Sequence, residues 1–464
     1  MSEISKRIIK LIVTWQSMLV FLTMMIAIIV AASFLVNPSP YSPLFILAGV
    51  VAIITLFTWI KKPVWAMYFA LFMILLPQSL IPAEVNSYLN RISTIIALVV
   101  WLIDVLRQRS RVILTSSTLI LIIFIAWAAI TLLWAEDLTI GWNVLQRYVL
   151  RLILFLLLLV NEIKTNKNLD GLMNTLALSG VLMVVVSGVT VLTQGYSSGA
   201  RLSVLDVNEN GLGIYLLISL QGVLWWASRP SKHNNAIKKW LAAIFFFTCI
   251  GLIGLSGSRG SAISLAVTLS AFLIWKPTRS WGILGFVIIG LAIIVAPIVF
   301  STTIARFLGT TGEAALGGRE TLWSAGLALI KDHLMVGVGI GNSPSQLIPY
   351  LVGSIGGISL KLLSFAATPV HNPVMAIWAE TGFLGLLIYL GVFVSSIISF
   401  VRQYFLFRRI RYQYLIPYYA IVSSVFCGYM VSWIKGGGME SDFSYFLMLA
   451  LLWIPFCIQE RSPE

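Results

Sequence analysis

Residues 112–134 read VILTSSTLILIIFIAWAAITLLW and contain no charged side chain. A helix needs about 20 consecutive apolar residues to cross the hydrocarbon core of a bilayer, so this stretch predicts a transmembrane helix. Two more charge-free stretches of this kind lie at residues 171–193 and 281–300. The sequence therefore predicts an all-α, polytopic integral membrane protein.

The composition of the whole chain supports this prediction. Of its 464 residues, 59% are hydrophobic and 10% are charged, whereas about 25% of the residues in a soluble domain are charged. An ordinary water-soluble globule is therefore excluded. Division of the chain at charge clusters and at Pro, Gly and Asn gives fourteen candidate spans, and twelve is the competing count. The candidate spans are residues 11–36, 44–60, 63–81, 92–106, 112–134, 142–160, 171–193, 211–227, 238–256, 260–275, 281–300, 372–400, 413–434 and 443–458.

The net charge of +14 is explained mainly by topology. Cytoplasmic loops of membrane proteins carry an excess of Lys and Arg. With a cytoplasmic N-terminus, 21 of the 31 Lys and Arg residues fall inside, eight fall on the outer face, and Arg147 and Arg151 lie within one span. We expect both termini to be cytoplasmic and leave the role of Arg147 and Arg151 open. No basic soluble domain remains for binding nucleic acid.

One long segment between spans, residues 301–371, is predicted on the outer face. Loops of this length are uncommon unless they have a function or a structure of their own. Within it, Gly318–Lys331 predicts an amphipathic helix at the membrane surface. Its apolar residues at helical spacing are Leu322, Trp323, Ala325, Leu327 and Ile330. We thus expect N-terminal transmembrane helices at 1–300, this outer loop, and C-terminal transmembrane helices at 372–464.

Four arginines predicted on the outer face are candidates for binding an anion, because topology gives no reason for them there. They are Arg201, Arg259, Arg306 and Arg319. A guanidinium presents a planar fork of donors that fits phosphate. Arg259 lies in LSGSRGS (residues 255–261), where small neighbours let a phosphate approach the backbone. The alternative is that each arginine extends to lipid phosphates or pairs with a nearby acid. For Arg259 and Arg319 we favour a binding role.

His371 lies where the outer loop re-enters the membrane, in TPVHNPVMAIWAETGFLG (residues 368–385). An imidazole titrates near neutral pH, so at such a boundary it is a candidate general base; the alternative is a histidine that anchors a helix start. Glu380 would be costly facing lipid, so we expect it to pair with an arginine or to hold a neighbouring loop. The GVGIGN segment at 337–342 lacks a preceding strand and predicts a loop after the surface helix, not a nucleotide site.

The cysteines and acids predict no metal or redox centre. Cys249, Cys427 and Cys457 lie within apolar stretches, without paired spacing or a nearby histidine. Such cysteines indicate neither a disulfide framework nor a zinc site. We expect no cofactor and no metal.

Four segments, in this order, resemble the O-antigen ligase and O-antigen polymerase superfamily of bacterial envelope glycosyltransferases. They are GARLSVLDVNENGLGIY (199–215), LSGSRGSAIS (255–264), GGRETLWSAGLALIKDHLMVGVGIGN (317–342) and HNPVMAIWAETGFLGLLIYL (371–390). The resemblance covers about residues 140–455. It implies a GT-C-like fold in the bacterial inner membrane, with a helical periplasmic loop domain over a cavity that opens to the outer leaflet.

The resemblance also implies an activity, namely metal-independent transfer of a glycan from an undecaprenyl diphosphate carrier to an acceptor sugar hydroxyl, such as one on lipid A core. Arg201, Arg259 and Arg319 would then bind the diphosphate, with Arg306 as a further candidate, since preorganised guanidiniums can stabilise its charge. His371 would accept the proton of the acceptor hydroxyl in an inverting displacement, with Glu380 supporting the local geometry. The other expected partners are membrane lipids.

Three alternatives stay open at the level of sequence. The first is an O-antigen or exopolysaccharide polymerase of the same superfamily. The second is a polytopic secondary transporter, although such proteins usually place polar sites near the bilayer midplane on interrupted helices. The third is a non-catalytic scaffold of an envelope machine.

Overall fold

The computed structural model describes most of the chain beyond residue 54. The described residues are 55–56, 58–76, 80, 83–108, 112–194, 202–204, 207, 209–229, 236–299, 319–355, 370–409, 413–435 and 443–458. The predicted span 11–36, most of the span 44–60, and the candidate residues Arg201 and Arg306 lie outside these ranges.

Within the described residues the chain is helical, and its one β contact is an isolated bridge between Val204 and Val207. The chain divides into two compact units, Met1–Val112 and Ile113–Glu464. The first unit contains α3 (Pro63–Leu75) and α4 (Ala83–Gln108), which pack against each other. The all-α prediction is confirmed.

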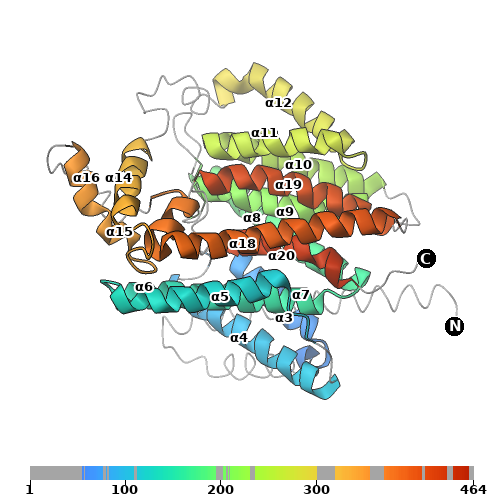
Figure 1. Cartoon of the computed structure of the whole chain (residues 1–464). Helices are drawn as coiled ribbons and strands as arrows, with labels where there is room; N and C mark the ends of the chain where they lie inside the picture. The colour runs from blue at the N-terminus through green and yellow to red at the C-terminus, as the bar shows by residue number, and fades with distance from the viewer. Residues whose placement is uncertain are drawn as a thin grey trace, which may run out of the picture. The chain divides into compact units, whose positions relative to one another are not determined.

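The second unit, Ile113–Glu464, contains the remaining helices (Figure 1). They are α5 (Ser116–Thr131), the 3₁₀ turn η2 (Leu132–Trp134), α6 (Leu138–Arg151), the π-helical segment η3 (Leu152–Leu159), α7 (Val160–Glu162), α8 (Asn166–Gln194), α9 (Glu209–Ser228), α10 (Ala236–Leu255), α11 (Arg259–Ile274), α12 (Arg279–Val299), α14 (Arg319–Asp332), α15 (Ser343–Gln346), α16 (Ile348–Ile355), α18 (Pro373–Arg409), the 3₁₀ turn η4 (Gln413–Leu415), α19 (Ile416–Ile434) and α20 (Phe443–Cys457).

Each span predicted beyond residue 60 falls on a helix. Seven described helices are long and apolar enough to cross a membrane: Tyr88–Arg107, Ser116–Trp134, Leu138–Glu162, Asn166–Thr193, Glu209–Ser228, Ala236–Leu255 and Pro373–Arg408. Their exposed surface is rich in Leu, Ile, Val and Phe, which suits contact with lipid. The chain is thus a multi-spanning membrane protein.

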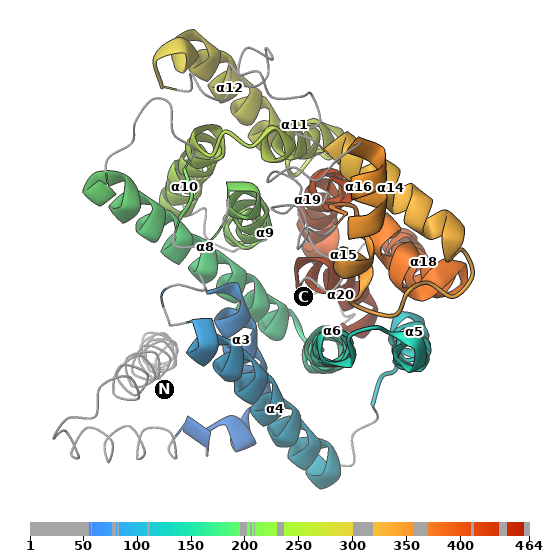
Figure 2. The ribbon, with the colours of Figure 1, turned by 90° about the vertical axis from the view of Figure 1, so that its left-hand side faces the viewer.

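The interior of the second unit is formed by α19 and α20, which lie between α9, α11, α18 and α6 (Figure 2). Almost every side chain of α20 is buried. Aromatic rings fill this interior: Tyr389 stacks on Tyr445, which stacks on Trp433. Large rings bury much apolar area and favour such offset contacts.

The span predicted at 372–400 falls on α18, and a break at Gly382 interrupts this helix. Gly382 has φ 70° and ψ −177°, a combination that is accessible almost only to glycine. The break separates a short first part, Pro373–Thr381, from a long apolar part that begins at Phe383. Glu380 therefore lies on the first part and not in the apolar stretch.

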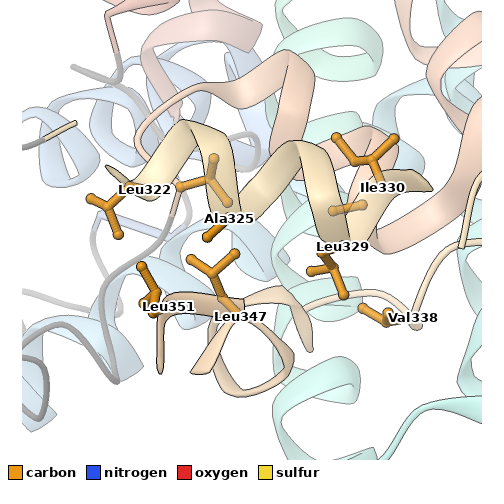
Figure 3. Packing of buried hydrophobic residues seen from close by; sticks show 9 residues of the cluster. Leu322, Ala325, Leu329, Ile330, Val338, Leu347 and Leu351 are labelled. Atoms are coloured by element: carbon orange, nitrogen blue, oxygen red, sulfur yellow. The ribbon is translucent and has the colours of Figure 1, made fainter. Parts of the chain in front are cut away.

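The surface helix predicted at 318–331 is present as α14, and its apolar face packs on protein (Figure 3). Leu322, Ala325 and Leu329 lie against α16 and the start of α18 in a buried cluster. That cluster consists of Leu322, Ala325, Leu329, Ile330, Val338, Leu347, Leu351, Val370 and Ala379. The assignment of Leu327 to this face is wrong, because Leu327 is exposed. At 3.6 residues per turn it lies away from the row that contains Leu322 and Leu329.

Candidate active site

The predicted outer-face segments gather at one end of the second unit. Figure 1 shows α14, α15 and α16 beyond the end at which α11 and α18 begin. Helix direction alternates along the chain, so the loops after α7, α9, α11 and α18 lie at the other end. That end carries Lys164, Lys167, Arg229, Lys238, Lys239, Lys276, Arg279, Arg402 and Arg408. We call it the basic end, and the opposite one the site end.

The turn before Arg259 is fixed by short hydrogen bonds. Gly257 has φ 60°, where a residue without a side chain is favoured. Ser258 then caps α11, because its Oγ accepts from the Ser261 backbone N–H at 3.2 Å. Ser258 Oγ also donates to Asn210 Oδ1 at 2.7 Å, which ties this turn to the start of α9. Arg259 is consequently the first residue of α11, with a half-buried side chain.

Two neighbours of this turn were not singled out as candidates from the sequence. Asn210 lies at the start of α9, and its hydrogen bond to Ser258 joins segments 48 residues apart. Lys435 ends α19, and its Cδ lies 3.9 Å from the position of a Cβ on Gly260. The site end thus places a second basic side chain next to the turn that carries Arg259. The isolated position of Lys435 after an apolar span was the signal that could have identified it.

The structure also describes the residue after Arg201 and the backbone of Arg319. The N–H of Leu202, the residue after Arg201, donates to the Leu255 carbonyl at 3.1 Å. Arg319 is the first residue of α14, and its side chain lies outside the described part of the structure. The structure thus describes the side chain of Arg259 among the four candidate arginines.

His371 occupies a tight turn immediately before α18. Its φ is 54°, which is uncommon for a residue with a side chain. Asn372 caps the helix, since its Oδ1 accepts from the N–H groups of Val374 and Met375 at 3.0 and 3.2 Å. Val370, on the other side of His371, is buried in the α14 cluster. Both neighbours are therefore anchored, which holds the backbone of His371 in this unusual conformation. Its imidazole is half-buried.

Glu380 holds the segment at 337–342, which we call the glycine loop. Its side chain is 2% exposed. One carboxyl oxygen accepts from the Gly341 N–H at 2.8 Å and the other from Ser343 Oγ at 2.8 Å. The backbone of Glu380 adds to this, because its carbonyl accepts from the Gly339 N–H at 2.9 Å. Of the two roles expected for Glu380, the structure shows that of holding a loop.

The opposite side of the glycine loop contacts the junction of α5 and α6. Trp134 Nε1 donates to the Gly337 carbonyl at 3.1 Å, and Thr131 Oγ1 accepts from the Ile340 N–H at 3.1 Å. Asn342 accepts from the Asp137 N–H at 2.7 Å. Gly337, Gly339 and Gly341 all have positive φ. The loop is a rigid link between α18 and the α5–α6 junction, which agrees with its prediction as a loop after the surface helix.

No group of three or more His, Cys, Asp or Glu side chains within the described ranges is placed to hold a metal ion. The polar groups at the site end are hydroxyls, amides, backbone N–H groups, basic side chains and carboxylates such as that of Glu380, which holds the glycine loop. Such an arrangement can bind an anion through hydrogen bonds and positive charge, with an imidazole as the group that titrates near neutral pH.

The comparisons with known proteins address the same segments. Residues 244–390 match the family described as O-antigen ligase. This match contains Arg259, Arg319, His371 and Glu380 together with the glycine loop. Residues 43–223 match a family of unknown function (DUF5935). None of the curated proteins compared with the chain matches it. The match covers residues 244–390, and it supports the resemblance to the O-antigen ligase superfamily.

Proposed function

We propose that this protein is a metal-independent, inverting glycosyltransferase of the O-antigen ligase type. It would move a glycan from an undecaprenyl diphosphate carrier to a hydroxyl of an acceptor sugar, with a GT-C-like arrangement of its helices. The observation that carries the proposal is the family match, because residues 244–390 include the SRG turn, α14, the glycine loop and His371.

The distribution of charge supports a site on the outer face of the bacterial inner membrane. Lys and Arg gather at the basic end, and cytoplasmic loops are the ones enriched in these residues. The site end is then the periplasmic or external end, where lipid-linked glycans await transfer. Both termini would be cytoplasmic.

The chemistry assigns a separate task to each group. The bond between the anomeric carbon and the diphosphate oxygen breaks while a bond from the acceptor oxygen forms on the opposite face. Negative charge develops on the leaving diphosphate, and Arg259, Arg319 and Arg201, with Arg306 as a further candidate, would stabilise it. His371 would accept the proton of the acceptor hydroxyl. Undecaprenyl diphosphate leaves with the electron pair of the broken bond.

Glu380 has a supporting part in this proposal. Its carboxyl oxygens are used by Gly341 and Ser343, so it positions the glycine loop relative to α18. His371 lies nine residues before Glu380, in the turn that precedes α18. Loss of Glu380 would therefore act on the reaction through the placement of α18 and the loop.

Purified full-length protein in phospholipid vesicles, supplied with undecaprenyl-diphosphate-linked glycan and an acceptor, tests this proposal. His371→Gln and Arg259→Gln should abolish transfer while the variants remain inserted and folded. His333→Gln and Arg402→Gln are matched controls, because His333 lies in the turn after α14 and Arg402 lies at the basic end. Activity of His371→Gln equal to that of the controls would overturn the assignment of the base.

The acceptor distinguishes a ligase from a polymerase. Deletion in the native host, followed by gel analysis of surface glycans, should leave uncapped core and accumulated lipid-linked polymer for a ligase. Core that carries a single repeat would identify a polymerase of the same superfamily. Uptake of a solute into vesicles that is insensitive to His371→Gln would instead identify a transporter.

A further inference from the structure

The turn between α14 and the glycine loop presents three consecutive apolar side chains to the surroundings. Leu334, Met335 and Val336 are 46%, 62% and 46% exposed. They follow the charged, exposed residues Lys331 and Asp332 and the half-buried His333. Such a contiguous apolar patch next to a polar segment marks a surface that contacts another apolar phase. We call these three residues the apolar turn.

The contact of the apolar turn with α18 indicates where the turn lies along the bilayer normal. The Phe383 N–H donates to the Leu334 carbonyl at 2.9 Å, so the turn lies level with the first residue after the break at Gly382. From Phe383 to Val401, α18 has 19 residues without a charge, and Arg402 follows at the basic end. At about 1.5 Å per residue this stretch is about 28 Å long, which matches the hydrocarbon thickness of about 30 Å. The outer boundary of the hydrocarbon therefore falls at Phe383.

Helix α5 independently indicates the same position of the apolar turn relative to the bilayer. Its candidate span is Ser116–Trp134, 19 residues long. Trp134, at the outer end of that span, donates from Nε1 to the Gly337 carbonyl. On the other side of the turn, Trp378 Nε1 donates to the Leu334 carbonyl at 3.2 Å. Tryptophans are enriched at membrane–water interfaces, and these two flank the apolar turn.

Two residues that bound this segment, Leu334 and Gly337, have backbone groups that are hydrogen-bonded within the protein. The Leu334 carbonyl accepts from two donors, Phe383 N–H and Trp378 Nε1. The Gly337 N–H donates to the His333 carbonyl at 3.0 Å, and its carbonyl accepts from Trp134. Polar backbone groups must be satisfied within the protein before a segment can lie in lipid. An ordinary solvated turn has no such requirement.

We propose that Leu334, Met335 and Val336 insert among the acyl chains at the outer boundary of the bilayer, beside α5 and α18. The apolar turn would then fix the height of α14 and α16 above the membrane. Its lipid contact continues the lipid-facing surface of α18, where Phe383 and Leu384 are exposed directly below it. The inference depends on the membrane topology and not on glycosyl transfer.

Spin labels on the full-length protein in vesicles of phosphatidylethanolamine and phosphatidylglycerol test this inference. Cys249, Cys427 and Cys457 are first replaced by alanine, and a nitroxide is attached to Met335→Cys. Collision with oxygen, which concentrates in lipid, is compared with collision with a water-soluble nickel complex. The lipid control is Leu387→Cys, since Leu387 is 51% exposed on α18, and the aqueous control is the exposed position Glu320→Cys on α14.

The label at position 335 should collide with oxygen several-fold more than with nickel, as the label at 387 does. A ratio equal to that at position 320 would overturn the proposal, because the turn would then lie in water. Low collision with both reagents would also overturn it, since a second copy or a partner protein would then cover the turn. Val336→Cys provides a second label site if Met335→Cys does not fold. Both measurements are independent of transferase activity.

Discussion

Two carboxylates of the second unit, Asp170 at the basic end and Glu380 at the site end, form different kinds of contact. At the basic end, Asp170 forms an ion pair with Arg229, and both side chains are about one quarter exposed. The same carboxylate accepts from Trp225 Nε1 at 2.8 Å and from Tyr414 OH at 3.0 Å. These contacts join α8, α9 and η4 through side chains alone.

At the site end, the corresponding contacts run between buried groups and the backbone. Glu380 binds the N–H of Gly341, and glycines allow the glycine loop to approach α18 closely. A backbone contact at close range has little room to adjust, whereas exposed side chains can re-form contacts with water. The site end should therefore tolerate substitution far less than the basic end, and a rigid scaffold of this kind suits a site that must position two substrates.

The largest expected effect is that of Gly382→Ala. A Cβ at Gly382 would lie 2.0 Å from the Met335 carbonyl oxygen, and the φ of 70° disfavours any side chain. Strain and collision together should cost at least about 3 kcal/mol and prevent stable folding. Thermal unfolding in detergent, followed by tryptophan fluorescence, measures this. Gly290→Ala in α12 is the matched control, because no atom lies within 4 Å of its Cβ position. Equal melting temperatures for Gly382→Ala and Gly290→Ala would refute the close approach of Gly382 to the Met335 carbonyl.

The next largest expected effect is the difference between Glu380→Ala and Asp170→Ala in the free energy of unfolding. Removal of the Glu380 carboxyl leaves the buried Gly341 N–H and Ser343 hydroxyl without this partner, at a cost of about 2–4 kcal/mol. Asp170 is partly solvated, so its loss should cost about 1 kcal/mol. Chemical denaturation of both variants in the same detergent measures the difference. Glu380→Gln should recover part of the loss, since its amide can accept from Gly341 and donate to Ser343. An Asp170→Ala cost above that of Glu380→Ala would reverse the comparison.

Sequence reasoning located the helices well, because membrane spans follow from apolar length alone. It also placed Arg259 and His371 at helix starts on one end, since the alternation of Lys- and Arg-rich loops determines which ends share a face. These inferences use only local composition and the order of the spans. The predicted element at 318–331 thus agrees with α14 to within a residue, whereas the predicted span 92–106 begins nine residues after the start of α4 and the predicted span 372–400 ends nine residues before the end of α18.

The glycine loop shows what could not be predicted. Its partners Glu380 and Trp134 lie about 40 and 200 residues away in the chain, and no local pattern encodes such pairs. The break at Gly382 could not be predicted either, because glycine is common within the apolar runs of membrane helices. The alternation of Gly337, Gly339 and Gly341 was the available signal, and it indicates a loop without naming its contacts.

Two asparagines offer a third test, because each forms the same two-point clamp at one of the two ends. At the site end, Asn342 accepts from the Asp137 N–H at 2.7 Å and donates to its carbonyl at 3.3 Å. At the basic end, Asn161 does the same to Ile113 at 2.7 and 3.0 Å. Alanine at either position should cost about 1–2 kcal/mol. Only Asn342→Ala should also lower the transfer rate, since it alone supports the glycine loop. A similar loss of rate in Asn161→Ala would show that stability, and not position, limits activity.

The smallest expected effect concerns the contact between α14 and α16, where Tyr350 OH donates to Asp332 at 2.6 Å. This hydrogen bond raises the pKa of Tyr350 above its usual value near 10. A raised pKa means that the contact is complete below pH 10 and is lost as the pH rises through the higher, folded-state value. Hydrogen exchange of α16 should accordingly stay constant from about pH 7 to 9, after correction for intrinsic rates, and increase above about pH 10. Tyr350→Phe should remove this alkaline step and lower local stability by less than about 1 kcal/mol, because the pair is exposed. An alkaline step that persists in Tyr350→Phe would assign the transition to another group.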